Sequence, residues 1–227
     1  MSKRLRTGIR WIDATGVNAY LLEYEGTITL VDAGTPFDAG RIGAAIEDIG
    51  RSLEDIDRIL LTHYDLDHVG SIARLPIDAP IYIGRGDLGF LTGAKRPPWR
   101  SVKGVTQRVS GVMLSDVPEE RIVPVDDGET IGGFEVYHTP GHTPGHTVYV
   151  HEARSVAFLG DLVVERSGSL RPTPWFLCYD EAENRRQIQR FEARSSPYEA
   201  AATGHGIPFR KGGSERLAAL SETLRKR

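Results

Sequence analysis

The sequence contains little cysteine and no long hydrophobic run. Cys178 is the only cysteine among the 227 residues. This excludes a framework of internal disulfides and is typical of a reducing, cytoplasmic compartment. No apolar run approaches the roughly 20 residues that a membrane-spanning helix needs. The basic residues 1–4 are not followed by the apolar stretch of a secretory signal. We therefore expect a cytoplasmic protein without a membrane partner.

Neither positive nor negative charge is in large excess. The chain has 28 Lys and Arg against 31 Asp and Glu, which gives a formal net charge of −3. Nucleic-acid-binding domains usually carry a strongly basic surface, so we expect no nucleic-acid partner. Hydrophobic residues make up 40% of the chain, enough for a full-sized core. We expect one domain over residues 1–227.

Hydrophobic patterns of strand and helix type alternate along most of the chain, which favours a mixed α/β layer fold. The predicted strands are 19–25, 27–32, 57–62, 80–83, 121–125, 133–138, 147–151, 155–160 and 200–206. The predicted helices are 38–50, with Asp38 as its cap, 71–75, 181–194 and a last one that Ser214 would cap. Residues 126–129 predict a hairpin turn between two of the strands.

Two segments, 84–118 and 165–180, lack a clear pattern. Long irregular stretches inside a compact domain are often functional, and we predict that these two cover a substrate. Aromatic side chains in them would line a pocket, although ordinary core packing explains them equally well. These side chains are Trp99, Trp175, Phe176 and Tyr179.

A dense polar cluster follows the apolar residues 59–61. His63, Asp65, Asp67 and His68 occupy four of six consecutive positions. Such a group can aim at one point only if the backbone turns tightly around it. Imidazole and carboxylate are ligands for zinc, iron and manganese, so the cluster predicts a metal site rather than a polar surface turn.

Four further residues of matching type follow apolar, strand-like runs elsewhere: Asp32, His142, Asp161 and His205. In layered α/β folds, the ends of strands converge at one edge of a sheet and carry functional loops. Because a potential ligand follows a strand-like run at each of these places, we predict that these residues share one metal site with the polar cluster.

These motifs resemble those of the metallo-β-lactamase superfamily. Its pattern is His-x-His-x-Asp-His, then a Thr-Pro-Gly-His-Thr-x-Gly-His turn, a Gly-Asp after a strand, and a late Gly-His. Residues 62–70, 139–146, 160–161 and 204–206 match in this order. The resemblance implies a four-layer αββα sandwich with a two-metal site at one edge.

The chain departs from the family pattern at Asp65, where the family usually has histidine. Carried over residue by residue, the resemblance assigns His63, Asp65 and His142 to site one, and Asp67, His68 and His205 to site two. Asp161 would bridge the metals, and Asp32 and His146 would orient ligands. Two divalent ions are implied. Zinc is expected first, while the harder carboxylate makes iron or manganese an alternative.

Two bridged metals can share one hydroxide and polarise a carbonyl or phosphoryl oxygen. The resemblance therefore implies a hydrolase of a small-molecule ester, lactone or thioester, with Asp67 able to carry a proton. Val164 stands where lactonase-type relatives have tyrosine, which disfavours a close lactonase. The alternatives are a di-iron redox enzyme on the same fold and a metal-binding protein without turnover. The sequence leaves the oligomeric state open.

Overall fold

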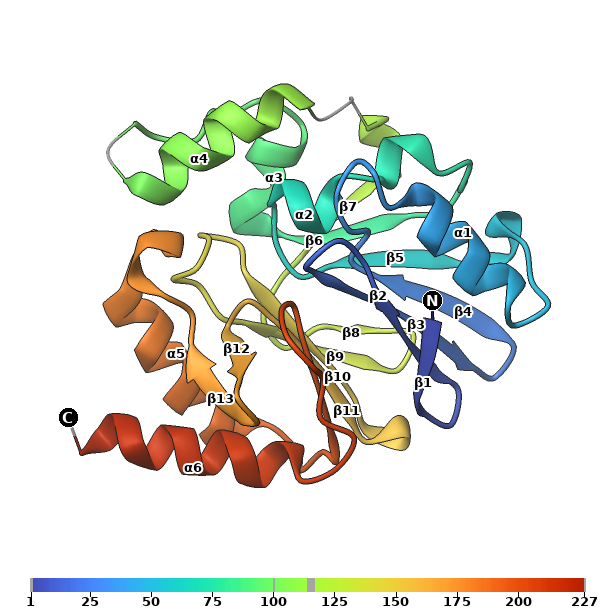
Figure 1. The fold of residues 1–227 in the computed structure, drawn as a ribbon. Helices are drawn as coiled ribbons and strands as arrows, with labels where there is room; N and C mark the ends of the chain where they lie inside the picture. Colours follow the sequence, from blue (N-terminus) through green and yellow to red (C-terminus); the bar gives the residue numbers. More distant parts are fainter. Residues whose placement is uncertain (1, 100, 114–116, 227) are drawn as a thin grey trace.

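The computed structural model describes residues 2–99, 101–113 and 117–226, and most of its strands form two sheets that face each other (Figure 1). The first sheet has seven strands in chain order. Neighbours are antiparallel from β1 to β4 and parallel from β4 to β7. The strands are β1 (Ser2–Arg6), β2 (Ile9–Asp13), β3 (Asn18–Tyr24), β4 (Thr27–Val31), β5 (Arg58–Leu61), β6 (Ile81–Gly84) and β7 (Ile122–Val125).

The second sheet has the order β14-β11-β10-β9-β8, and β12 and β13 form a separate hairpin. Only the pair of β11 and β14 is parallel within this sheet. The strands are β8 (Thr130–Ile131), β9 (Phe134–His138), β10 (Thr147–His151), β11 (Val156–Gly160), β12 (Val163–Arg166), β13 (Ser169–Pro172) and β14 (Ala200–Thr203).

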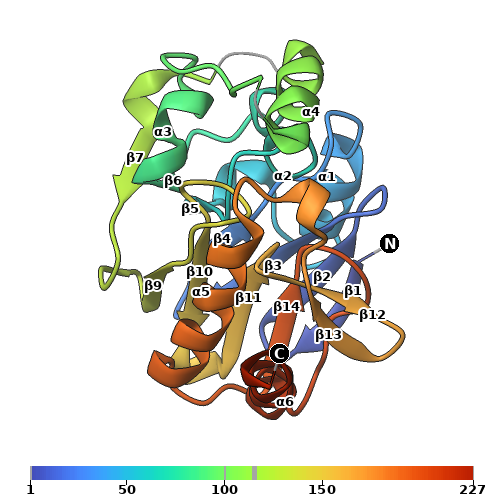
Figure 2. The same ribbon diagram turned by 90° about the vertical axis from the view of Figure 1, so that its left-hand side faces the viewer.

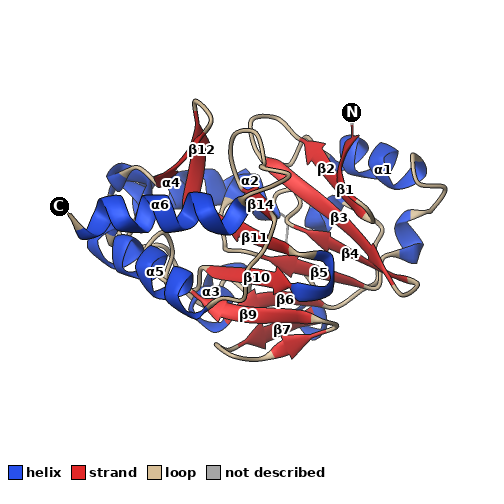
Figure 3. Cartoon of the chain, turned by 90° about the horizontal axis from the view of Figure 1, so that it is seen from below, coloured by secondary structure: helices blue, strands red, loops and turns tan. Residues whose placement is uncertain are grey.

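Helices cover the outer faces of the pair of sheets (Figures 1 and 2). Those on the side of the first sheet are α1 (Ala39–Glu47), α2 (Leu66–Val69), α3 (Arg85–Leu91) and α4 (Val102–Ser110). The second sheet is covered by α5 (Glu181–Arg194) and α6 (Gly213–Arg225), which run side by side (Figure 3). The expected four-layer αββα sandwich is confirmed.

The alternation of side chains along each strand builds three separate apolar clusters, one for each contact between layers. In β5, Ile59 packs toward α1, whereas its neighbour Leu60 packs between the sheets. In β10, Tyr149 lies between the sheets and Val150 faces the layer of α5 and α6. Strands such as β5 and β10 therefore have apolar residues on both faces because both faces are covered.

All the predicted strands are present, but β1, β2, β8, β12 and β13 were not predicted. The hairpin turn predicted at residues 126–129 is wrong, because β7 belongs to the first sheet and β9 to the second. The chain crosses between sheets at that point. The actual hairpin joins β8 to β9 through Gly132 and Gly133, whose φ angles of 53° and 87° suit glycine.

The two segments predicted to be irregular contain regular structure. Segment 84–118 holds α3 and α4, and segment 165–180 holds the β12–β13 hairpin and a 3-10 helix, Trp175–Leu177. Residue 100 and residues 114–116 of the first segment lie outside the described residues. Helix α3 escaped prediction because four glycines and two prolines interrupt the apolar spacing at residues 84–98.

Asp38 is the N-cap residue of α1 as predicted, whereas Ser214 is not the N-cap residue of α6. Asp38 precedes α1, but its carboxylate accepts hydrogen bonds from Thr15 and Thr35 instead of from the first turn of the helix. Gly212, not Ser214, is the residue before α6. Both side chains tie distant loops together, and this use could not be read from local sequence. Among the described residues, no helix combines the length and the apolar character that a bilayer crossing requires.

Replacing Phe158 with alanine should strongly destabilise the sandwich. The ring is 1% exposed and lies 5.5 Å from the ring of Tyr20 and 6.0 Å from that of Phe134, centroid to centroid. We expect the free energy of unfolding in urea to fall by about 3–5 kcal/mol. Phe37→Ala is the control, because Phe37 is 73% exposed. Equal losses in the two variants would contradict the assigned core.

Candidate metal centre

The predicted ligands lie at one edge of the sandwich, where strands of both sheets end. Asp32 follows β4, and the cluster from His63 to His68 follows β5. His142 lies between β9 and β10, while Asp161 and His205 follow β11 and β14. The parallel pairs β4–β5 and β11–β14 end at the same edge, so the architecture collects these side chains as expected.

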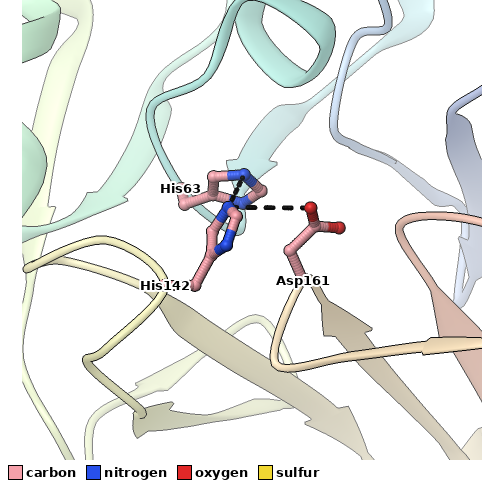
Figure 4. A group of neighbouring side chains, drawn as sticks. All are labelled: His63, His142 and Asp161. Carbon is pink, nitrogen blue, oxygen red and sulfur yellow. Dashed lines mark hydrogen bonds and ion pairs between the residues drawn. The ribbon is translucent and has the colours of Figure 1, made fainter. Parts of the chain in front are cut away.

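Three donor atoms of site one form a nearly equilateral triangle. Nε2 of His142 lies 3.1 Å from Nε2 of His63 and 3.1 Å from Oδ2 of Asp65. The third edge, from His63 Nε2 to Asp65 Oδ2, is 3.2 Å. A tetrahedral ion with bonds of about 2.0 Å has ligands about 3.3 Å apart. Asp161 Oδ2 lies 3.6 Å from His142 Nε2 (Figure 4), so the donor set fits a metal.

Site two is built around Asp161. His205 Nε2 lies 3.3 Å from Asp161 Oδ2 and 3.4 Å from Asp67 Oδ2. His68 Nε2 lies 3.6 Å from Asp161 Oδ1, and both atoms are buried without a hydrogen-bond partner in the described structure. A Cβ on Gly204 would clash with Asp161 Oδ1. Unpaired buried donors of this kind also fit a metal.

Hydrogen bonds at Nδ1 aim three imidazoles at the centre. His63 Nδ1 pairs with Thr62 Oγ1 at 3.0 Å, and His205 Nδ1 with the carbonyl oxygen of Gly16 at 2.8 Å. His68 Nδ1 pairs with Asp32 Oδ2 at 2.9 Å. In each ring Nε2 is left to face the site. Such partners fix the orientation of metal-binding histidines.

Asp32 and His146 lie behind the ligands, as the resemblance implied. The carboxylate of Asp32 accepts hydrogen bonds from the backbone N–H and the hydroxyl of Thr62, both at 2.8 Å. Asp32 has a φ of +57°, which Asp and Asn tolerate better than most residues. His146 Nε2 accepts the backbone N–H of Asp161 at 3.0 Å, so it positions the strand end that carries the shared carboxylate.

In the metal-free protein, the surroundings shift the pKa values of the histidines at the centre in opposite directions. Burial, with the neighbouring His68 and His142, holds the pKa of His63 well below its usual value. Burial also disfavours the charge on His68, but Asp32 and Asp161 raise its pKa to about 10. Asp161 raises the pKa of His205 to about 9. Metal binding at site two would therefore release protons.

Three polar residues of segment 84–118 reach the centre, and sequence reasoning missed them. Asp87 accepts hydrogen bonds from the backbone of Tyr64 and Gly145, and so ties the two ligand loops together. Gln107 Nε2 donates to Asp65 Oδ1 at 2.7 Å. Lys103 Nζ contacts Asp65 Oδ2 and lies 3.0 Å from His142 Nε2. Their spacing of four places Lys103 and Gln107 on one face of α4, a signal readable only once the helix is known.

The four aromatic residues predicted to contact substrate lie in different surroundings. Trp99 is 64% exposed and packs against the Arg108 guanidinium, 4.6 Å from the ring centroid. Trp175 and Phe176 are exposed and pack against each other. The Tyr179 hydroxyl bonds to Gln107, and thus supports Asp65 indirectly. Substrate contact by these side chains stays a prediction.

Comparison with known proteins agrees with the fold. The family model of the Metallo-beta-lactamase superfamily matches residues 12–205, and the chain belongs to this superfamily. It is 30% identical over 225 residues to the uncharacterized protein YobT of Bacillus subtilis (strain 168), covering 92% of this chain and 91% of YobT. It is 28% identical over 232 residues to the probable metallo-hydrolase YflN of the same strain, covering 89% and 85%.

A solved structure shows the same fold. The metallo-beta-lactamase family protein TTHA1429 from Thermus thermophilus superposes with a TM-score of 0.72 at 23% identity. The match covers 98% of this chain and 81% of that chain. Membership of a metallo-hydrolase superfamily, together with the donor sets, implies divalent metal ions at this centre.

Asp32→Asn should weaken metal binding without disturbing the backbone. Asparagine tolerates the positive φ, but its amide has one acceptor oxygen, which cannot accept both from the Thr62 N–H, as Oδ1 does, and from His68 Nδ1, as Oδ2 does. We expect the zinc affinity at site two to fall about 10- to 100-fold, measured by competition with a chromophoric chelator. Asp13→Asn on the exposed end of β2 is the control. Unchanged affinity in Asp32→Asn would show that Asp32 does not orient His68.

Asp87 should make the stability of the metal-free protein depend on pH. Burial raises its pKa to about 6, from an ordinary value of 3.8. The folded state then binds this proton more tightly than the unfolded state. The stabilisation is complete below the ordinary value, and about 3 kcal/mol is lost as the pH rises through about 6.

Asp87→Asn lacks this titration. The difference in unfolding free energy, wild type minus variant, should therefore fall by about 3 kcal/mol between about pH 4 and about pH 7. Urea unfolding of the metal-free proteins measures it, and exposed Asp78→Asn should show no such trend. A difference that stays constant with pH would mean that Asp87 is ionised across the range.

Proposed function

We propose that this protein is a metal-dependent hydrolase of a small-molecule ester, lactone or thioester, with zinc as the expected metal. The observation that supports this most directly is the position of Asp161, whose two carboxylate oxygens face His68 on one side and His142 and His205 on the other. One carboxylate between two donor sets suits a pair of ions.

The residues that would hold the ions are those of the two donor sets. His63, Asp65 and His142 form one set, while Asp67, His68 and His205 form the other. When bound, two metals polarise a carbonyl or phosphoryl oxygen and activate water. The imidazoles would be held for this by Thr62, Asp32 and the Gly16 carbonyl, which fix the rings before metal arrives.

The exposure of the ligands indicates the side from which a substrate would enter. The side chains of Asp67 and His205 are 37% and 30% exposed, whereas that of Asp161 is 4% exposed. We therefore place the substrate beside Asp67. The carboxyl group of Asp67 would then carry the proton that the leaving group of the substrate needs, which is a general acid–base role. The balanced charge and the single cysteine support the proposal of a cytoplasmic enzyme that acts on neither nucleic acid nor membranes.

Asp65 favours a second candidate, a redox enzyme with two iron ions. Carboxylate is a harder ligand than imidazole, and hard oxygen ligands favour iron and manganese more than zinc. Asp65 Oδ2 is one corner of the site-one triangle, so the metal that site one takes decides between the candidates.

The zinc-loaded protein should hydrolyse at least one member of a panel of aryl esters, lactones and thioesters. Stripping the metal with a chelator should abolish turnover, and adding zinc back should restore it. Asp67→Asn should lower kcat about 100-fold or more, and Asp78→Asn, at an exposed carboxylate, should not. Metal content is measured for each protein.

Other outcomes would point elsewhere. A fully loaded protein that hydrolyses no member of the panel would identify a metal-binding protein without turnover. Iron in the purified protein, with oxygen consumption and no hydrolysis, would identify the redox enzyme.

A further inference from the structure

Site one already contains a cation of the protein itself. Lys103 lies on α4, its side chain is 5% exposed, and its Nζ contacts Asp65 Oδ2. The same Nζ lies 3.0 Å from His142 Nε2. These are two of the three donor atoms in the site-one triangle. A lysine ammonium has only hydrogens to offer, so it uses the lone pairs that a metal ion would need.

The surroundings hold Lys103 in this place. Asp65 Oδ1 accepts from Gln107 Nε2, one turn further along α4, and the Tyr179 hydroxyl bonds to Gln107. This arrangement turns Oδ2 of Asp65 toward the ammonium. The 3-10 helix Trp175–Leu177 packs against α4. The lysine is therefore part of a built contact between α4 and the ligand loop.

Among the described residues, no lysine or arginine contacts site two, and its carboxylates pair with its own histidines. Its donors face one another, and two of them, His68 Nε2 and Asp161 Oδ1, lack a hydrogen-bond partner. The two sites thus differ in the groups that balance the charge of their carboxylates. Site one is neutralised by a lysine that is not among the predicted ligands, while site two is neutralised by histidines that are themselves predicted ligands.

We propose that Lys103 is a built-in competitor of the site-one metal, so that the protein binds one metal tightly at site two and a second one much more weakly. A divalent ion in the triangle would meet the ammonium at contact distance, and like charges repel strongly in a buried site. The second ion can bind only when Lys103 leaves Asp65 and His142. The inference rests on the metal centre of the proposed function but not on its substrate.

This pairing also gives Asp65 a role that histidine could not fill. A neutral imidazole at position 65 would leave the ammonium without a counter-charge, and a buried unpaired charge is costly. The carboxylate at position 65 and the amine at position 103 therefore belong together as a unit. Removal of the amine alone should leave Asp65 free to bind metal.

The test is the metal stoichiometry of the full chain, which needs no substrate. Metal-free protein is titrated with Zn²⁺ by calorimetry, and the bound metal is counted after gel filtration. Wild type should bind one equivalent tightly and a second about 100-fold or more weakly. Lys103→Met, which keeps the length without the charge, should bind two equivalents tightly. Lys103→Gln repeats the measurement in case the methionine variant folds poorly.

Two controls keep the charge at position 103 as the only variable. Lys103→Arg retains a cation and should behave like wild type, as should Lys95→Met at an exposed position of the same segment. Co²⁺ spectra should show a second four-coordinate signal only in the neutral variants.

Three results would overturn the inference. Two tight equivalents in wild type would show that Lys103 does not compete. Weaker metal binding in Lys103→Met would identify the amine as a ligand. If no protein bound metal, the metal centre would itself be wrong, whereas absence of hydrolysis with the expected stoichiometries would count only against the proposed function.

Discussion

Buried nitrogen and oxygen atoms need partners, and this requirement organises the edge of the sandwich where the strands end. Three imidazoles there, those of His63, His68 and His205, use Nδ1 to bind the scaffold. The other nitrogen must then face a cation, a proton or an acceptor. His68 Nε2 and Asp161 Oδ1 have no hydrogen-bond partner among the described residues. A metal ion bound to these two atoms would satisfy both of them. The free energy of folding thereby holds these two atoms in place as a binding site.

The two sheets contribute to both donor sets, so the centre exists only when the sandwich is assembled. His63 and His68 come from the loop after β5 of the first sheet. His142, Asp161 and His205 come from loops of the second sheet. Tyr149 lies between the sheets and donates a hydrogen bond to the Leu61 carbonyl oxygen, which joins the two halves directly behind the ligand loop. Packing in the central layer therefore sets the distances in the site.

Charge balance distinguishes the two sites within this common frame. The acidic ligands are compensated differently: Asp65 by Lys103, and Asp161 by the histidines around it. An ammonium and a metal ion are both cations, but only the metal can polarise a carbonyl group as a Lewis acid. A family pattern of ligands thus leaves open how each site is occupied, since one substituted ligand can favour an internal cation. The departure at position 65 gains its meaning from a residue 38 positions away.

Local sequence was sufficient to predict nine of the strands (β3–β7, β9–β11 and β14), the αββα class through the resemblance, and the candidate ligands from His63 to His205 that the structure brings together, because strand-end turns carry their chemistry in contiguous motifs. It was insufficient for β1 and β2, for the crossing from β7 to β9, and for α4. Those features depend on pairing and packing between distant segments. The placement of Lys103 shows the difference most clearly. A single lysine in a glycine-rich segment carries no local signal, and only the docking of α4 on the ligand loops turns it into a buried cation beside Asp65, where desolvation gives its charge a consequence for metal binding.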